Sequence, residues 1–152
     1  MRFTLRTGAR SSGVNGARAH DEWSEETVAT SSGLSALLDQ VAGEMTAAGY
    51  DARDVFAVRL ALEEAVVNAI KHGHQGDTSK AVRVNYTVGP DEALITVEDE
   101  GPGFQPEDVP DPLDPENLER ACGRGVFLMR HYMTWVKYNE CGNRVTLCKR
   151  RR

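Results

Sequence analysis

Apolar and polar residues follow a helical period over residues 60–73, which read LALEEAVVNAIKHG. Ala, Leu and Glu favour a helix, and the glycine that closes the segment is placed to end it. On one side of this helix, Glu64, Asn68 and Lys71 recur at steps of four and three, so a carboxylate, an amide and an ammonium share a face. A single polar stripe of this kind is usually a solvated surface. The positions that can face the fold interior are Leu60, Ala61, Ala65 and Ala69.

The remaining periodic segments predict two more helices and five strands. One helix runs from Ser31 or Ser32 to Gly49, and another begins over residues 126–130. Period-two alternation and β-branched residues indicate strands at 23–30, 82–88, 94–99, 134–139 and 144–148. The order predicts an α+β fold in which helices cover one face of a sheet.

Residues 102–115 break this regular pattern. They contain five of the six prolines of the chain, mixed with Asp and Glu. Regular structure is disfavoured there, and a long irregular segment within a compact domain is more often functional than idle. Glycines stand on both sides of it, at Gly101, Gly103, Gly123 and Gly125.

Composition and charge narrow the class of protein. A chain of 152 residues that is 40% hydrophobic and 27% charged is expected to be one globular domain. The net charge of -5 argues against direct nucleic-acid binding, and no apolar run has membrane-spanning length. The three cysteines show no CxxC spacing, which favours a reducing cytoplasm over a disulfide framework or a zinc site.

The two ends of the chain are basic. Residues 1–20 carry four arginines and no acid before Asp21, which predicts a flexible basic leader. The domain is expected to span residues 21–149, and residues 150–152 to be a basic tail. Lys149 and the three arginines that follow it are predicted to be solvated.

Two further segments carry residues suited to a nucleotide. Asp99 follows a predicted strand and precedes Gly101 and Gly103. An acid placed there can accept a hydrogen bond from an exocyclic amine, and the glycines let backbone approach a planar ligand. Residues 123–126, Gly-Arg-Gly-Val, open a helix whose free N–H groups suit phosphate oxygens, with Val126 as the first apolar residue.

Together, these three segments resemble the nucleotide-binding boxes of gyrases, heat-shock chaperones, histidine kinases and mismatch-repair ATPases, the GHKL superfamily. The boxes are EAVVNAIKHG at 64–73, DEGPGF at 99–104 and GRGVFLM at 123–129. The chain is a short single domain, and its first box has the residue pattern E-A-V-x-N-A-x-x-H-G. In both respects it is most similar to bacterial anti-sigma factor serine-protein kinases. The resemblance implies a two-layer α/β sandwich of Bergerat type, with a mixed sheet backed by helices on one face. It also implies a lid at about residues 105–122 that closes over the phosphates of ATP.

The resemblance assigns a role to each matched residue. Asn68 corresponds to the amide that holds Mg²⁺, and Asp99 to the acid that recognises the adenine amino group. Glu64 corresponds to the proposed general base, since a carboxylate can accept the proton of an attacking hydroxyl. The glycines correspond to backbone turns around the base and the phosphates: Gly101, Gly103, Gly123 and Gly125.

Three cations are candidates for contact with phosphate. Lys71 occupies a position where histidine kinases often have a phosphate-contacting lysine. Arg120 and Arg124 flank the end of the predicted lid, and the sequence does not decide which of them meets the terminal phosphate. Glu63 is expected at the surface, because adjacent helical residues point about 100° apart.

The sequence therefore predicts an ATP- and Mg²⁺-dependent serine kinase. By family resemblance, it would bind a sigma factor and phosphorylate a serine on an anti-anti-sigma (STAS-type) antagonist, and it would form a homodimer. One alternative is a nucleotide-binding interaction module without significant phosphotransfer. Another is a stand-alone histidine-kinase-like ATPase domain. The partner surface is not encoded in the nucleotide boxes, so the partners themselves are not identified.

Overall fold

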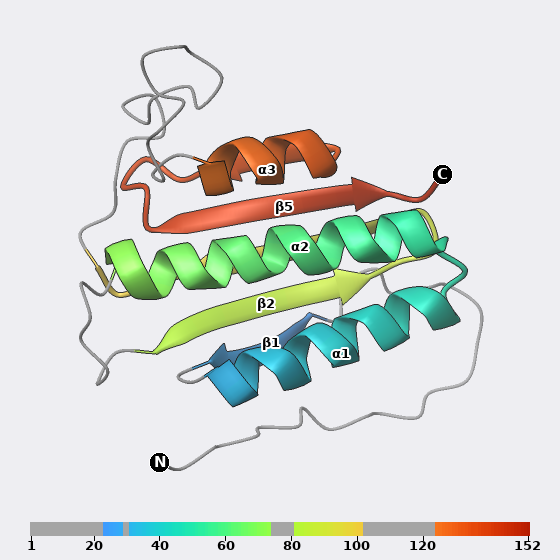
Figure 1. The fold of residues 1–152 in the computed structure, drawn as a ribbon, viewed down its shortest axis with the longest axis horizontal. Coiled ribbons are helices and arrows are strands. Elements are labelled where there is room, and N and C mark those ends of the chain that lie inside the picture. Colours follow the sequence, from blue (N-terminus) through green and yellow to red (C-terminus); the bar gives the residue numbers. More distant parts are fainter. Residues whose placement is uncertain (1–22, 29–30, 74–80, 102–123) are drawn as a thin grey trace.

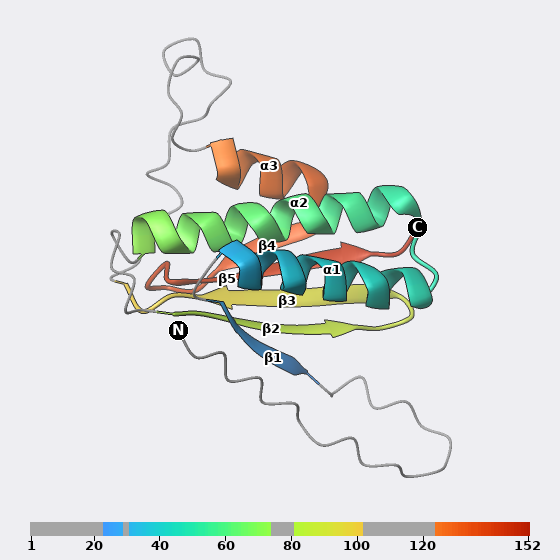
Figure 2. The same cartoon turned by 60° about the horizontal axis from the view of Figure 1, so that its bottom comes forward.

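The computed structural model describes residues 23–28, 31–73, 81–101 and 124–152 of the chain. Its elements follow in the order β1 (Ser24–Val28), α1 (Ser31–Ala47), α2 (Ala52–Asn68), a π-helical turn (Ala69–Gly73), β2 (Val82–Val88), β3 (Glu92–Glu98), α3 (Arg124–Tyr132), β4 (Trp135–Tyr138) and β5 (Arg144–Arg150). The helices form one layer and the strands the other, with all three helices on the same face of the sheet (Figure 2). The predicted two-layer α+β sandwich is confirmed.

The sheet order is β1-β2-β3-β5-β4, and each neighbouring pair among the described strands is antiparallel. The expected mixed sheet is therefore wrong for this part of the chain. Tight turns join β2 to β3 and β4 to β5, and such hairpins can only produce antiparallel neighbours. The segment between β3 and β4, which includes α3, brings β5 beside β3 in the antiparallel sense as well.

The hydrophobic core lies between the two layers. Alternate residues of β2 and β3 point into it, and Tyr86 and Ile95 are fully buried. From the helical side, the expected inward residues Ala61, Ala65 and Ala69 are buried, whereas Leu60 is only half-buried. The largest fully buried side chains are Tyr86, Met45, Leu62, Ile95, Met129, Leu147, Val28, Val41, Val58, Val66, Val82 and Val84.

Helix α2 lies between α1 and α3 and runs antiparallel to both (Figure 1). Asp51 caps its first turn, because the carboxylate accepts a hydrogen bond of 2.8 Å from the backbone N–H of Asp54. The ends of α2 and β3 and the start of α3 therefore lie at one end of the molecule (Figures 1 and 2). This arrangement brings the three predicted boxes to the same end.

Lys149 is not solvated, which corrects the prediction for that residue, whereas Arg150, Arg151 and Arg152 are exposed as expected. Strand β5 continues to Arg150, and Lys149 is buried within it. Arg152 donates from its backbone N–H and its Nε to the fully buried carboxylate of Asp54, at 3.2 and 3.0 Å. The predicted basic leader, residues 1–20, lies outside the described residues.

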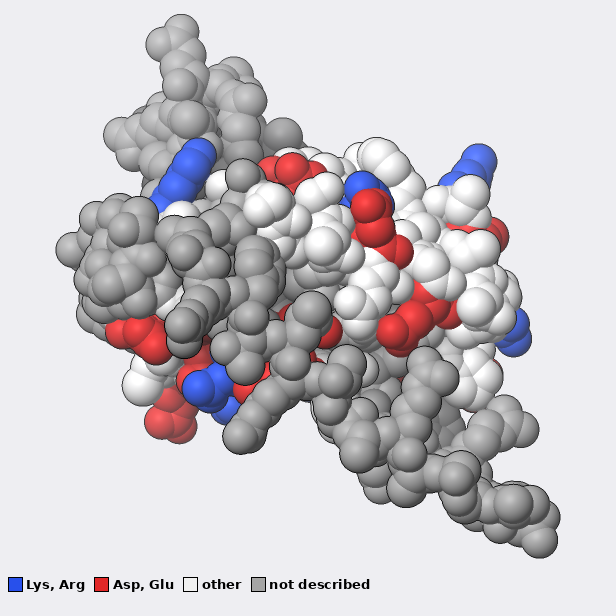
Figure 3. All heavy atoms as spheres, turned by 90° about the horizontal axis from the view of Figure 1, so that it is seen from below, with Lys and Arg blue, Asp and Glu red and all other residues white. Residues whose placement is uncertain are grey.

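The charged surface is mixed where the structure describes it. Seen from the side of β1 and α1, Asp and Glu side chains are interspersed with Lys and Arg (Figure 3). Arg59 and Asp39, for example, form an exposed ion pair of 2.8 Å between α2 and α1. This is the pattern of an ordinary solvated surface.

Candidate functional site

The first and third boxes meet where α3 begins. A Cβ atom added to Gly125 would lie 2.7 Å from Nδ2 of Asn68 and 2.9 Å from Oε2 of Glu64. Both side chains come from the last turns of α2, and both are half-buried. The predicted base, the predicted metal ligand and the predicted phosphate turn are thus in contact in the folded chain.

A π-helical turn, Ala69–Gly73, ends α2 directly after Asn68. The backbone N–H of Ala69 donates to the carbonyls of Ala65 and Val66, four and three residues before it, so the last turn of α2 tightens just before the π-helical turn. Such a turn holds more residues than an α-helical turn and is frequent at functional sites. It therefore changes the direction in which the residues after Asn68 project.

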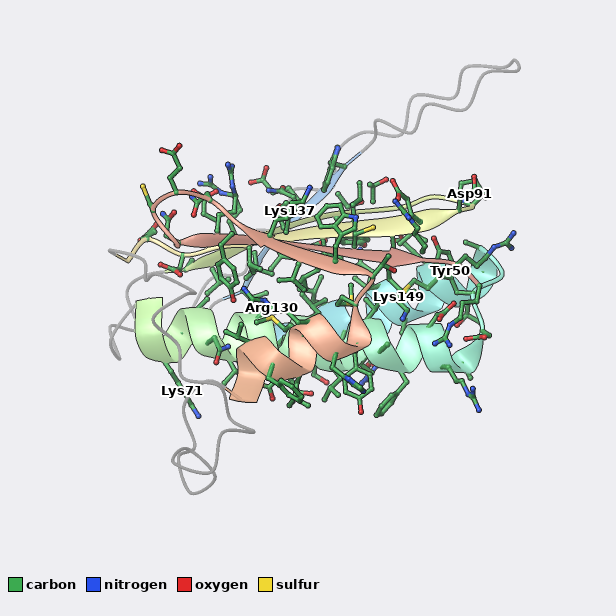
Figure 4. The ribbon with its side chains drawn as sticks, turned by 90° about the horizontal axis from the view of Figure 1, so that it is seen from above. Tyr50, Lys71, Asp91, Arg130, Lys137 and Lys149 are labelled. Carbon is green, nitrogen blue, oxygen red and sulfur yellow. The ribbon has the colours of Figure 1, made fainter. Side chains whose placement is uncertain are left out.

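Lys71 does not join the contact between Glu64, Asn68 and Gly125. It is exposed, and its side chain points away from the sheet at the end of α2 (Figure 4). The expectation of one polar face that includes Lys71 thus holds for Glu64 and Asn68 but not for the lysine, because the π-helical turn interrupts the helical period. Glu63 is exposed, as expected for the outer side of α2.

Asp99 lies directly after β3 and is 9% exposed. Its Oδ1 accepts a hydrogen bond of 2.7 Å from the backbone N–H of Gly101, so the short turn between them fixes the carboxylate. The backbone of Asp99 is bonded in turn to Asn143, in the turn between β4 and β5. A nearly buried, oriented carboxylate of this kind can recognise a hydrogen-bond donor with defined direction.

Several predicted residues lie outside the described part of the chain. These are Gly103, Arg120, Gly123 and the lid at residues 105–122. Arg124 is the first residue of α3, and the structure describes its backbone alone. Val126 is buried in the core, so its side chain anchors α3 and any contact it makes with phosphate would come from its backbone.

Two functional candidates were not identified from the sequence. Asn139 and Asn143 bond to each other across the turn between β4 and β5, and Asn143 also bonds to Asp99. The sequence contains a signal for the turn, Gly142 followed by Asn143, and Gly142 adopts a φ of 71° there. That signal indicates a hairpin and gives no indication of contact with Asp99.

The residues present suit a magnesium nucleotide. Mg²⁺ prefers oxygen ligands and is usually held by one or two protein groups together with substrate phosphates. Asn68 supplies an amide oxygen beside a helix start that can accept phosphate oxygens. Among the described residues no group of three or more His, Cys, Asp or Glu is placed to hold a metal.

Comparison with known proteins fits this geometry. Residues 27–149 match the family model of the histidine kinase-like ATPase domain, which covers most of the chain. The chain belongs to the histidine kinase-like ATPase family. Its helical layer and antiparallel sheet are therefore those of this family's domain.

Relatives of this ATPase-family chain include an anti-sigma factor and serine-protein kinases. It is 42% identical over 88 residues to an anti-sigma F factor of Clostridium perfringens, which covers 55% of this chain and 61% of the relative. It is 30% identical over 108 residues to the serine-protein kinase RsbW of Bacillus licheniformis, covering 66% of this chain and 68% of the relative. For the RsbW of Listeria monocytogenes the identity is 28% over 116 residues, covering 72% and 74%.

These relatives confirm the resemblance to the anti-sigma factor serine kinases. The matched segment spans only 61% of the length of the Clostridium perfringens relative. Within the described residues, no helix has the length and apolar character needed to cross a bilayer.

Proposed function

We propose that this chain is an ATP-dependent serine kinase of the anti-sigma type. It binds a sigma factor and phosphorylates a serine on an anti-anti-sigma antagonist. The observation that carries the proposal is the contact of Gly125 with Glu64 and Asn68, which joins a carboxylate, an amide and a helix N-terminus in one place. The relatives, an anti-sigma F factor and a serine-protein kinase, support the class of reaction and of partner.

Each residue has a chemical task in this proposal. Asn68 holds Mg²⁺, which when bound neutralises charge on the phosphates. The start of α3 receives phosphate oxygens at its free backbone N–H groups. Asp99 accepts a hydrogen bond from the adenine amino group. Phosphoryl transfer depends mostly on positioning and charge neutralisation, so these contacts supply much of what the reaction requires.

Glu64 acts as the general base. It accepts the proton of the serine hydroxyl as that oxygen bonds to the terminal phosphorus, while the bond from phosphorus to the bridging oxygen breaks and ADP leaves. A neutral imidazole acceptor would need no base, so a carboxylate one helical turn before Asn68 favours a hydroxyl acceptor. The choice of serine over histidine therefore depends on Glu64.

The partners belong to the same proposal. A sigma factor and an antagonist of the STAS type would compete for the kinase, and the phosphorylation state of the antagonist would decide which one is held. Homodimerisation and a cytoplasmic location complete the proposal.

Substitution of the base tests the proposal. Glu64→Gln is expected to retain Mg-ATP binding and to lower the rate of phosphoserine formation about 100-fold or more. Purified protein, labelled ATP and a candidate antagonist provide the measurement. Glu63→Gln is the matched control, because Glu63 is the exposed neighbour of Glu64 and should leave the rate unchanged.

The alternatives give different results in the same experiment. Equal transfer by the wild type and Glu64→Gln would overturn the role of Glu64 as the base. ATP binding without transfer to any antagonist would favour an interaction module in which the nucleotide organises a binding surface. Label on histidine instead of serine would favour a histidine-kinase-like domain.

A further inference from the structure

Asn143 holds the strand end that carries Asp99. Its backbone carbonyl accepts a hydrogen bond of 2.9 Å from the N–H of Asp99, and its Nδ2 donates to the carbonyl of Asp99 at 3.3 Å. One residue thus bonds to the backbone groups on both sides of the Asp99 Cα. Because a side chain moves with its own backbone, these two bonds limit where the carboxylate can lie.

Asn139 fixes the side chain of Asn143 in the required orientation. Its Nδ2 donates to Oδ1 of Asn143 at 2.7 Å, and its own Oδ1 accepts from the backbone N–H groups of Asn143 and Arg144, at 3.1 and 3.2 Å. Because Oδ1 of Asn143 faces Asn139, its Nδ2 is turned toward Asp99. The two asparagines therefore form a brace between the β4–β5 turn and the end of β3.

The brace acts on a carboxylate that is already restricted. Asp99 is 9% exposed, and its Oδ1 accepts from the N–H of Gly101 at 2.7 Å. A hydrogen bond weakens steeply when its angle or length departs from the optimum. A small shift of the strand end would consequently weaken any bond that Asp99 makes to a base, with little effect at Glu64 and Asn68 on α2.

We propose that Asn143, held by Asn139, is a positioning residue that sets the place and direction of the Asp99 carboxylate for base recognition. The inference rests on the proposed function, in which Asp99 bonds to the adenine amino group. It adds two residues that determine specificity, Asn139 and Asn143. They belong to the turn between β4 and β5, which lies outside the three boxes. Asn143 acts through Asp99 and makes no contact with the reacting atoms.

Two substitutions of Asn143 test the inference in the full chain. Asn143→Asp keeps the size of the side chain and an acceptor for Asn139 but removes the donor to Asp99, and Asn143→Ala removes the side chain without adding charge. We expect both to raise the dissociation constant of Mg-ATP about fivefold, the equivalent of one hydrogen bond. The preference for ATP over GTP should fall by a similar factor. Binding of magnesium tripolyphosphate, which has no base, should change by less than about twofold.

The controls separate positioning from folding. Asn85→Asp makes the same chemical change at a half-buried residue of β2 that alternates with the buried Val84 and Tyr86, and it should alter none of the three affinities. Thermal unfolding without nucleotide reports any general loss of stability. If the Asn143 variants lose affinity for ATP, GTP and tripolyphosphate equally, Asn143 only supports the turn and the inference is overturned.

Asp99→Asn, measured in parallel, distinguishes this inference from the proposed function. If that variant loses the preference for ATP while both Asn143 variants keep it, only the inference is overturned. If Asp99→Asn keeps the preference, Asp99 does not recognise the base, and the proposed base contact and the inference are overturned together.

Discussion

At the scale of single residues, Gly125 shows how little space separates α3 from α2. An added Cβ would lie under 3 Å from atoms of Asn68 and Glu64, closer than such atoms approach in folded proteins. Gly125→Ala must therefore displace one of these side chains or the start of α3. We expect about a tenfold loss of Mg-ATP affinity and a loss of about 1 kcal/mol in the free energy of unfolding.

Gly43→Ala is the matched control for that substitution. Gly43 also lies in a helix, α1, but an added Cβ there meets nothing within 4 Å. Its replacement should stabilise the fold by about 0.5–1 kcal/mol and leave nucleotide affinity unchanged, because alanine is the better helix former. Titration with a fluorescent ATP analogue and urea unfolding measure the two effects. Unaltered affinity in Gly125→Ala would contradict the assignment of this contact to the phosphate site.

Asn68 allows a prediction that depends on metal. If its amide oxygen holds Mg²⁺, Asn68→Ala should weaken ATP binding in the presence of magnesium and have little effect when magnesium is chelated. Isothermal titration with and without a chelator measures this difference, and Asn85→Ala on β2 provides the control. A loss of the same size under both conditions would mean that Asn68 contacts the nucleotide directly.

At the scale of elements, one buried carboxylate joins the start of α2 to the end of β5. Asp54 is fully buried and bonds to Arg152, while Lys149 Nζ lies 3.9 Å from Asp54 Oδ1. The same ammonium donates at 2.7 Å to the carbonyl of Tyr132, the last residue of α3. Lys149, which lies on β5, thus joins its strand to both α2 and α3.

Asp54→Ala would leave the buried Lys149 without its carboxylate. Removal of one partner of a buried ion pair is costly, so we expect a loss of about 3 kcal/mol in the free energy of unfolding. Asp39→Ala is the control, because the pair of Asp39 and Arg59 is exposed and should contribute under about 1 kcal/mol. Urea unfolding at neutral pH measures both. Similar small losses in the two variants would mean that Asp54 does not stabilise this junction.

The bounds of most elements follow from local sequence, whereas the junctions between them do not. The alternation over 82–88 predicted the bounds of β2 without error, and on its inner face Val82, Val84 and Tyr86 are buried while Val88 is half-buried. The extension of β5 to Arg150 was missed because Lys149 and its neighbours resemble a solvated basic run. Their partner, Asp54, is 98 residues away from Arg152 in the sequence, and no local pattern records such a pairing.

In the candidate site, too, some features follow from the local sequence and others depend on the folded structure. Glu64 and Asn68 share a helical face, so their proximity follows from the helical period. The departure of Lys71 from that face depends on a π-helical turn, for which the sequence gives no signal. The contribution of Asn143 could not be predicted either, because it depends on the register of β5 against β3.

At the scale of the whole molecule, the burial of tyrosine hydroxyls and a cysteine thiol predicts that the free energy of unfolding falls at alkaline pH. Burial raises the pKa of Tyr50 and of Tyr138 from 10.0 to about 12, and that of Cys148 from 9.0 to about 11. For Tyr86, burial followed by its hydrogen bond to Glu44 raises the pKa further. In each case the folded state binds the proton more tightly than the unfolded chain does.

A raised pKa contributes stability that is fully present below the unfolded value and is lost as pH rises through the folded value. The free energy of unfolding should therefore be level near pH 8 and fall from about pH 9 to pH 12, by about 1.4 kcal/mol per pH unit for each group inside its own window. Urea unfolding across this range measures the slope. Tyr50→Phe should be less steep between pH 10 and pH 12, and an unchanged slope would contradict the assignment to Tyr50.

The bond between Arg152 and Asp54 has a practical consequence for handling the protein. Arg152 donates its main-chain N–H to a fully buried carboxylate, so it belongs to the folded structure. An affinity tag fused directly after it would start next to the first turn of α2. Any segment attached there must therefore leave the bonds between Arg152 and Asp54 undisturbed.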